Sequence, residues 1–163
     1  MSSESIAEYK VILASNSSIR KKILEDSGIS FEVIASDVDE EELKKSFSSK
    51  NFKDNCLALA KAKALEVSNK QKNAYVIGSD QICCYGEEIF SKPLTKENCF
   101  KTLSKLSGNT HYQNCGISIC KDGKEIWSHY AQASLTMKSL SDSEIKDYID
   151  KDEPLMACGA YRF

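Results

Sequence analysis

One carboxylate stands inside an apolar stretch of the chain. Asp80 lies in the segment Val76-Ile77-Gly78-Ser79-Asp80-Gln81, and a charge in such a predicted strand costs free energy unless it is paired or binds a metal. Gly78 would let a ligand or a second backbone approach the strand closely. From these residues alone, Asp80 fits a catalytic carboxylate and a structural one that caps a neighbouring loop equally well.

A second candidate is the hydroxyl-rich turn Ser15–Ser18, which joins a short apolar run to a predicted helix. The start of a helix offers free backbone N–H groups and the positive end of the helix dipole, both of which suit a phosphate. Arg20, one turn into the helix, could add a bidentate contact to phosphate oxygens. A capped helix with a solvated basic face is the simpler interpretation of this segment taken alone.

Other charged residues each allow a structural and a functional interpretation, but together they fit the binding of phosphates and a metal. Lys92 directly precedes a predicted helix, Lys61 and Lys63 lie on another, and the acidic segment Asp37–Glu42 contains Asp39 and Glu40. Each is most simply a solvated side chain, although two carboxylates and substrate phosphates suffice to bind Mg²⁺. Together the segments supply cations for a polyphosphate, carboxylates for a metal and one carboxylate to activate water, which are the needs of phosphoanhydride hydrolysis.

The elements that must position these residues predict an α/β domain with a mixed sheet. Apolar or alternating runs predict strands over Val11–Ala14, Phe31–Ala35, Ala74–Tyr85, Thr110–Cys120 and Glu125–Met137, with a short return strand after Gly86. Helical spacing and capping residues predict helices over Ile19–Asp26, Lys53–Asn69, Thr95–Leu106 and Ser141–Asp150. The acidic segment is predicted to be a loop that leads into a polar stretch ending at Asn51.

Composition narrows the class of protein. The chain has 163 residues, 41% hydrophobic and 28% charged, which fits one soluble domain. A net charge of −2 gives no support for binding a nucleic-acid polymer. No apolar run approaches the roughly 20 residues that span a bilayer, and the N-terminus lacks a signal-peptide pattern, so we expect a cytoplasmic protein without a membrane partner. The seven cysteines are expected to be reduced, small apolar residues, without a zinc site.

Taken in order, the motifs resemble those of the Maf (septum-formation-inhibitor-like) family. The resemblance runs from Tyr9 onward with order and spacing kept. Its motifs are Leu13-Ala14-Ser15-x-Ser17-x-x-Arg20, Val38-Asp39-Glu40, Leu59-Ala60-x-x-Lys63-Ala64, Gly78-Ser79-Asp80, Lys92-Pro93, Leu106-Ser107-Gly108-x-Thr110-His111 and Glu153-Pro154-Leu155-x-x-Cys158-Gly159-Ala160-Tyr161.

This resemblance implies a fold, a reaction and roles for residues. The fold would be α/β, with a mixed twisted sheet, flanking helices and two lobes around a nucleotide cleft, as in the inosine triphosphate pyrophosphatases. The reaction would convert a nucleoside triphosphate into the monophosphate and pyrophosphate with a divalent cation, Mg²⁺ or Mn²⁺. Asp80 would accept the proton of the attacking water and, with Glu40, bind the metal. The residues that would hold phosphates are Ser15, Arg20, Lys63 and Lys92.

Two positions within these motifs bear on the nucleobase of the expected substrate. The residue before the motif arginine is Ile19, and the residue after the motif aspartate is Gln81. The branch of the family that acts on dTTP and UTP usually has Arg and Thr there. Gln81, together with the late Cys158-Gly159, resembles the branch that acts on 7-methyl-GTP, whose cationic ring favours stacking and a nearby carboxylate. We therefore expect 7-methyl-GTP or another modified nucleotide as substrate.

The resemblance also implies a further strand and a C-terminal helix after the Gly-Ala-Tyr motif. Residues 1–163 are therefore expected to form a single Maf-like domain that is truncated at its C-terminus. Loss of a docked element exposes apolar core surface, which predicts reduced stability, compensation by a homodimer, or impaired catalysis. The alternative function is a nucleotide-binding or regulatory protein with impaired or lost turnover, and a third hypothesis is a scaffold without a nucleotide site.

Overall fold

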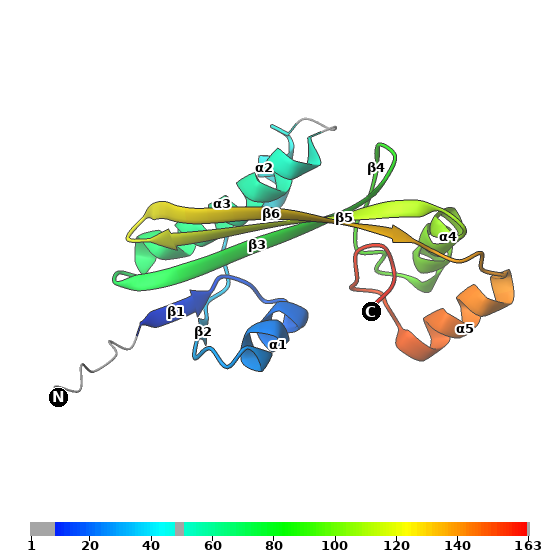
Figure 1. Ribbon diagram of the computed structural model, residues 1–163, viewed down its shortest axis with the longest axis horizontal. Coiled ribbons are helices and arrows are strands. Elements are labelled where there is room, and N and C mark those ends of the chain that lie inside the picture. Colours follow the sequence, from blue (N-terminus) through cyan, green and yellow to red (C-terminus); the bar gives the residue numbers. More distant parts are fainter. Residues whose placement is uncertain (1–8, 48–50, 163) are drawn as a thin grey trace. The chain divides into compact units, whose positions relative to one another are not determined.

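The computed structural model, which describes residues 9–47 and 51–162, has an α/β fold (Figure 1). Its sheet has the strand order β2-β1-β3-β5-β6, and β4 pairs with β3. Strand β1 runs parallel to β2 and β3, whereas β3 and β4 are antiparallel. The predicted α/β class, with a mixed sheet and flanking helices, is confirmed.

Strands and helices follow one another along the chain largely in the order that the sequence predicts. The strands are β1 (Lys10–Leu13), β2 (Glu32–Val33), β3 (Ala74–Tyr85), β4 (Glu88–Phe90), β5 (Thr110–Lys121) and β6 (Lys124–Thr136). The helices are α1 (Ser18–Asp26), α2 (Glu40–Lys44), α3 (Phe52–Lys70), α4 (Lys96–Leu106) and α5 (Asp142–Asp152).

The fold divides into two compact units. The described residues of unit 1 lie within Met1–Phe47, Leu57–Asp80 and Gly116–His129, and those of unit 2 lie within Ser48–Cys56, Gln81–Cys115 and Tyr130–Phe163. Strands β3, β5 and β6 each contribute residues to both units, because the boundary falls within each of these three strands. On β3 it falls between Asp80 and Gln81.

Unit 1 is built on parallel strands covered by a helix. Ile12 of β1 lies opposite Val76 of β3 in the sheet register, and both are fully buried. Ala64 and Val67 of α3 complete the same apolar cluster. Small residues on the buried face of α3 let the helix lie close to β3, which matters for the charged residues described below.

Unit 2 contains two capped helices that pack together, α4 and α5. Leu103 of α4 and Ile145 of α5 are buried in one apolar cluster with Ala160. Thr95 caps α4, and Ser141 and Glu144 form the predicted capping box of α5. The caps explain why these helices begin at the residues expected from the sequence.

The acidic segment differs from its prediction. It is not entirely a loop, because helix α2 begins at Glu40. The Asp39 side chain accepts a hydrogen bond of 3.0 Å from the backbone N–H of Glu42, which caps the helix. The helix dipole favours acidic residues in the first turn of a helix. A run of acidic residues is also typical of a loop, so this pattern does not distinguish the two. Residues 48–50 of the predicted polar stretch lie outside the described residues.

Two further findings concern the described residues. The seven cysteines lie among them and form no disulfide there, and five of the seven are buried. None of the described helices combines the length and apolar character needed to cross a membrane.

Candidate active site

Lys63 lies at the centre of a charged cluster in unit 1. Its ammonium Nζ is 2.8 Å from Oε1 of Glu40 and 3.2 Å from Oδ1 of Asp80. Lys63 is only 8% exposed and Asp80 only 9%, so water screens this pair poorly, whereas the Glu40 side chain is 41% exposed. The interpretation of Lys63 as a surface lysine is therefore wrong, whereas Lys61 on the same helix is exposed.

The close approach of α3 to β3 makes this cluster geometrically feasible. A Cβ atom built on Gly78 would lie 2.1 Å from the carbonyl oxygen of Ala60 and 2.8 Å from the backbone nitrogen of Ala64. Only glycine fits at that distance. The second backbone suggested by the sequence is therefore α3, and the contact at Gly78 brings Lys63 beside Asp80.

Burial perturbs the acidity of Asp80. Loss of hydration raises the pKa of the Asp80 carboxyl above its ordinary value, and the charge of Glu40 acts in the same direction. Lys63, by its charge and its hydrogen bond, and Arg20, by its charge, oppose this and lower the pKa. Desolvation is the largest of these effects, so Asp80 is a stronger base than a solvated aspartate. A carboxylate of this kind is suited to take a proton from water.

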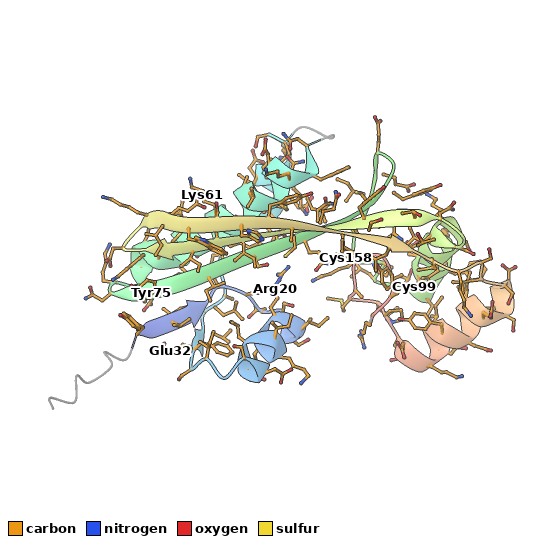
Figure 2. The ribbon with its side chains drawn as sticks, in the orientation of Figure 1. Arg20, Glu32, Lys61, Tyr75, Cys99 and Cys158 are labelled. Atoms are coloured by element: carbon orange, nitrogen blue, oxygen red, sulfur yellow. The ribbon has the colours of Figure 1, made fainter. Side chains whose placement is uncertain are left out.

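The loop between β1 and α1 brings two predicted phosphate ligands together. Nη1 of Arg20 is 3.5 Å from Oγ of Ser15, which also accepts a hydrogen bond of 3.1 Å from the backbone N–H of Ser17. Ser17 caps α1. In Figure 2 the Arg20 side chain leaves α1 on the side of β3, in accord with its effect on Asp80. Ile19, between these residues, is 57% exposed.

A divalent cation fits the residue types of the charged cluster. Glu40 and Asp80 offer hard carboxylate oxygens that converge on one positive charge, the Lys63 ammonium. Such a pair suits an ion that takes its other ligands from substrate phosphates and water. Among residues 9–47 and 51–162, no group of three or more His, Cys, Asp or Glu side chains is placed to hold a metal without substrate. Asp39, considered with Glu40 from the sequence, instead caps α2.

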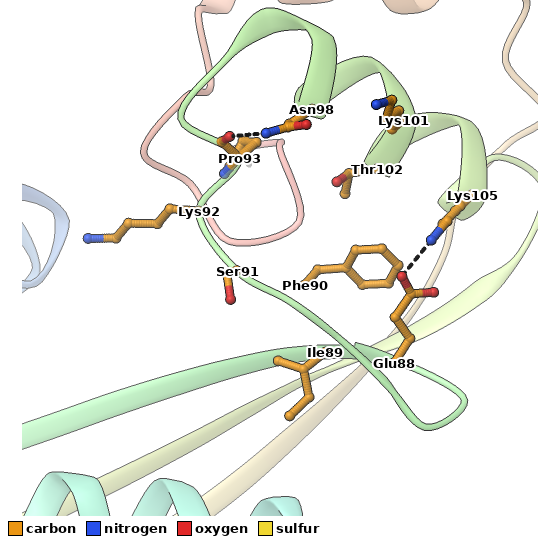
Figure 3. A pocket seen from close by; sticks show the side chains of 10 residues that line it. All are labelled: Glu88, Ile89, Phe90, Ser91, Lys92, Pro93, Asn98, Lys101, Thr102 and Lys105. Atoms are coloured by element: carbon orange, nitrogen blue, oxygen red, sulfur yellow. Dashed lines mark hydrogen bonds and ion pairs between the residues drawn. The ribbon is translucent and has the colours of Figure 1, made fainter. Parts of the chain in front are cut away.

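Two predicted site residues, Lys92 and Gln81, belong to unit 2. Lys92 is exposed and lies at the rim of a surface hollow of about 250 Å³, from which its side chain extends away (Figure 3). The hollow also contains Lys105, which is ion-paired to Glu88. Gln81 is exposed and donates a hydrogen bond of 2.7 Å from Nε2 to Oε1 of Gln113.

Sequence reasoning gave no individual role to the residues that Gln81 contacts. Gln113 bonds in turn to the Tyr161 hydroxyl, which bonds to His111. His111 and Gln113 are buried at alternate positions of β5, a pattern that the sequence displays. Their partner Tyr161 lies 48 residues beyond Gln113 in the chain, and such a non-local contact leaves no signal in one sequence.

Comparison with known proteins identifies relatives along nearly the whole chain. The family model described as Maf-like protein matches residues 10–163. A nucleoside triphosphate pyrophosphatase of Legionella pneumophila (strain Corby) is 36% identical over 161 residues, covering 99% of this chain and 80% of the relative. A 7-methyl-GTP pyrophosphatase of Brucella abortus biovar 1 (strain 9-941) is 38% identical over 157 residues, covering 94% of this chain and 79% of the relative.

Solved structures give a weaker likeness. The HAM1 protein from Coxiella burnetii matches with a TM-score of 0.47 and 15% identity, over 78% of this chain and 71% of that protein. The Ham1 protein of Staphylococcus aureus matches with the same TM-score and 20% identity, over 82% and 72%. These values are too low to assign site residues.

Proposed function

The chain belongs to the Maf-like protein family, and from that premise we propose that it hydrolyses a nucleoside triphosphate to the monophosphate and pyrophosphate. The names of relatives at 36% and 38% identity support this enzyme class. The observation that carries it to particular residues is the charged cluster in which Lys63 bridges Glu40 and the buried Asp80. A base, a cation for phosphate and a second carboxylate are thus assembled within one unit.

Asp80 serves as the base in the proposed reaction. A water molecule gives its proton to the carboxylate while its oxygen forms a bond to the α-phosphorus. The bond between that phosphorus and the oxygen bridging to the β-phosphorus breaks, and pyrophosphate leaves. The pKa of Asp80, raised by burial, makes proton acceptance more favourable than at a solvated aspartate.

Phosphate binding would release Asp80 from its ion pair. Without substrate, the Lys63 ammonium is shared by two carboxylates. Polyphosphate oxygens compete for the same ammonium, and Arg20, Ser15 and Lys92 would hold other phosphate oxygens. A divalent cation, Mg²⁺ or Mn²⁺, held by Glu40 and Asp80 would neutralise phosphate charge.

We further propose a methylated guanine nucleotide, 7-methyl-GTP, as substrate. The support is Gln81 beside Asp80, the apolar Ile19 before Arg20, and relatives named 7-methyl-GTP pyrophosphatase among those at 37–38% identity. Relatives at 34–36% identity carry the broader name nucleoside triphosphate pyrophosphatase, so the test must compare different nucleobases.

A product screen tests the proposed function. The chain is incubated with 7-methyl-GTP and the unmodified ribo- and deoxyribonucleoside triphosphates, with Mg²⁺, with Mn²⁺ and with a chelator. Pyrophosphate and monophosphate should appear in equal amounts, fastest with 7-methyl-GTP, and disappear with the chelator. Release of orthophosphate would contradict the proposed bond cleavage, and nucleotide binding without any product would favour a binding protein.

A further inference from the structure

A chain of hydrogen bonds in unit 2 ends at the Gln81 side chain. Nε2 of Gln81 donates to Oε1 of Gln113 at 2.7 Å, and Nε2 of Gln113 donates to the Tyr161 hydroxyl at 2.9 Å. The same hydroxyl is 2.6 Å from Nε2 of His111. His111 is 1% exposed and Gln113 is 8% exposed, so water has little access to the inner part of this chain, whereas Gln81 at its outer end is exposed. We call these four residues the relay.

The buried end of the relay holds the Tyr161 hydroxyl. This hydroxyl accepts from Gln113 and shares a second hydrogen bond with Nε2 of His111, in which the donor depends on the tautomer of the ring. Burial lowers the pKa of His111. The rings of His111 and Tyr161 also pack edge to face, with centroids 5.3 Å apart. The tyrosine is therefore fixed by a bond at its hydroxyl and by contact at its ring.

The bond to Gln113 determines how the Gln81 amide is turned. Because one N–H of this amide is bonded to Gln113, the carbonyl oxygen, an acceptor, has a fixed position at the exposed end beside the second N–H. An unconstrained glutamine can rotate its amide by 180° and offer either a donor or an acceptor. The relay removes this choice, since reversing Gln81 would place two carbonyl oxygens against each other.

An outward acceptor discriminates between purines. Guanine and 7-methylguanine carry two neighbouring donors, N1–H and the exocyclic amine, whereas adenine carries one donor, its exocyclic amine, beside an unprotonated N1. A fixed carbonyl oxygen can accept from both donors of guanine, whereas on adenine it meets one donor and the lone pair at N1. Unpaired polar groups at a binding site give strong rejection of the wrong ligand.

We propose that Gln113 and Tyr161 are positioning residues that hold Gln81 with its carbonyl oxygen outward, and so select guanine over adenine nucleotides. This inference rests on the proposed function, in which Gln81 faces the base. Gln113 and Tyr161 act through Gln81 and do not themselves touch the substrate. A residue that merely stabilises unit 2 would affect both nucleotides alike, whereas a positioning residue changes the preference between them, and this difference can be measured.

The primary test compares kcat/KM for 7-methyl-GTP with kcat/KM for ATP. Tyr161→Phe and Gln113→Leu should each lower this ratio about fivefold to tenfold, the size of one neutral hydrogen bond, through KM rather than kcat. Gln113→Glu should preserve the ratio, because a carboxylate oxygen still accepts from Gln81. Tyr112→Phe, a change at an exposed tyrosine of the same strand, is the matched control and should leave the ratio unchanged.

A double-mutant cycle separates positioning from stability. In a Gln81→Leu background, Tyr161→Phe should have no further effect on the ratio, since the residue that it positions is gone. An equal effect in both backgrounds would overturn the proposal, as would an unchanged ratio in Tyr161→Phe or a loss of kcat shared by both nucleotides. Melting temperatures confirm that each variant is folded. If Tyr161→Phe does not fold, the pair Gln113→Leu and Gln113→Glu decides.

Calorimetry distinguishes failure of the relay from failure of the proposed function. The Kd values of 7-methyl-GTP and ATP are measured for the same variants, with no need for turnover. Preferential binding that depends on the relay, without pyrophosphate release, would refute the reaction and support the relay. Pyrophosphate release with a nucleotide preference that ignores the relay would do the reverse. Absence of binding to either nucleotide would overturn both.

Discussion

Asp80 and Gln81 are consecutive residues of β3, yet they begin networks of opposite kind. Asp80 belongs to a charged cluster, in which the Lys63 ammonium lies 3.2 Å from Asp80 and 2.8 Å from Glu40. Gln81 belongs to a neutral relay that ends at a buried histidine. The first network lies in unit 1 and the second in unit 2.

In the proposed mechanism, one strand serves two tasks. A charge in a poorly hydrated place gives a base and a phosphate ligand, but charge–charge attraction depends weakly on direction. Neutral hydrogen bonds are weaker and fix the orientation of an amide, which is what recognition of a base requires. We therefore assign reaction rate to the charged cluster and nucleotide choice to the relay.

The largest expected effect comes from removing the charge at Asp80. Asp80→Asn keeps the size of the side chain and should lower kcat about 10³-fold, within the range for loss of a general base. Pyrophosphate release with each nucleotide is the measurement. Asp26→Asn, at an exposed aspartate paired with Lys22, should retain full activity. An active Asp80→Asn enzyme would remove Asp80 from the mechanism.

Replacing the shared cation should have the next largest effect. Lys63→Met removes the ammonium that both carboxylates contact and should lower kcat/KM about 10²-fold by loss of a buried phosphate ligand. Lys61→Met is the control on the same helix, because Lys61 is exposed and pairs with Glu125 at 3.5 Å. Equal losses of kcat/KM in the two variants would show that the net charge of α3, rather than the contacts of Lys63 in the cluster, determines activity.

The pH dependence should follow the acidity of Asp80. The base must be ionised, so kcat/KM should fall as pH decreases through the Asp80 pKa, which burial raises above its ordinary value. Lys63 lowers this pKa by its charge and its hydrogen bond. Lys63→Met should therefore move the acidic limb of the profile to higher pH. A limb that stays in place, or moves to lower pH, would assign it to another group.

Replacing Asp80 should have a smaller effect on stability, and here we expect a gain rather than the loss expected for activity. An acid whose pKa is raised by folding binds more protons in the folded state, so its contribution to stability decreases as pH rises from the unfolded to the folded pKa. Where Asp80 is ionised it therefore destabilises the fold, and Asp80→Asn should raise Tm by about 2–4 °C. Calorimetric unfolding at pH 7 measures this, and a lower Tm would mean that the ion pair outweighs desolvation.

Much of the fold follows from local patterns. The capping residues Thr95 and Ser141 and the spacing of apolar residues located α4 and α5, because these signals act within a few residues. The acidic helix α2 was missed because its residues also suit a loop. The burial of Lys63 had a visible signal, since at helical spacing it shares a face with Ala60, Ala64 and Val67, all of which are buried.

The contacts that join distant segments could not be predicted in the same way. Asp80 was recognised from its apolar surroundings and from the family motif, but its partners lie 17 residues away at Lys63 and further at Glu40. Gly78 indicated a close approach without naming the partner. The relay joins β3, β5 and Tyr161, and only the folded chain brings these together.

The central claim, that rate and nucleotide choice are divided between adjacent residues, is tested most directly by kcat and KM for 7-methyl-GTP and ATP in the wild type, Asp80→Asn and Gln81→Leu. The account predicts that Asp80→Asn lowers kcat for both nucleotides by the same factor and keeps their ratio of kcat/KM. Gln81→Leu should lower that ratio about tenfold and leave kcat for ATP unchanged. A change of the ratio in Asp80→Asn, or an equal loss for both nucleotides in Gln81→Leu, would contradict it.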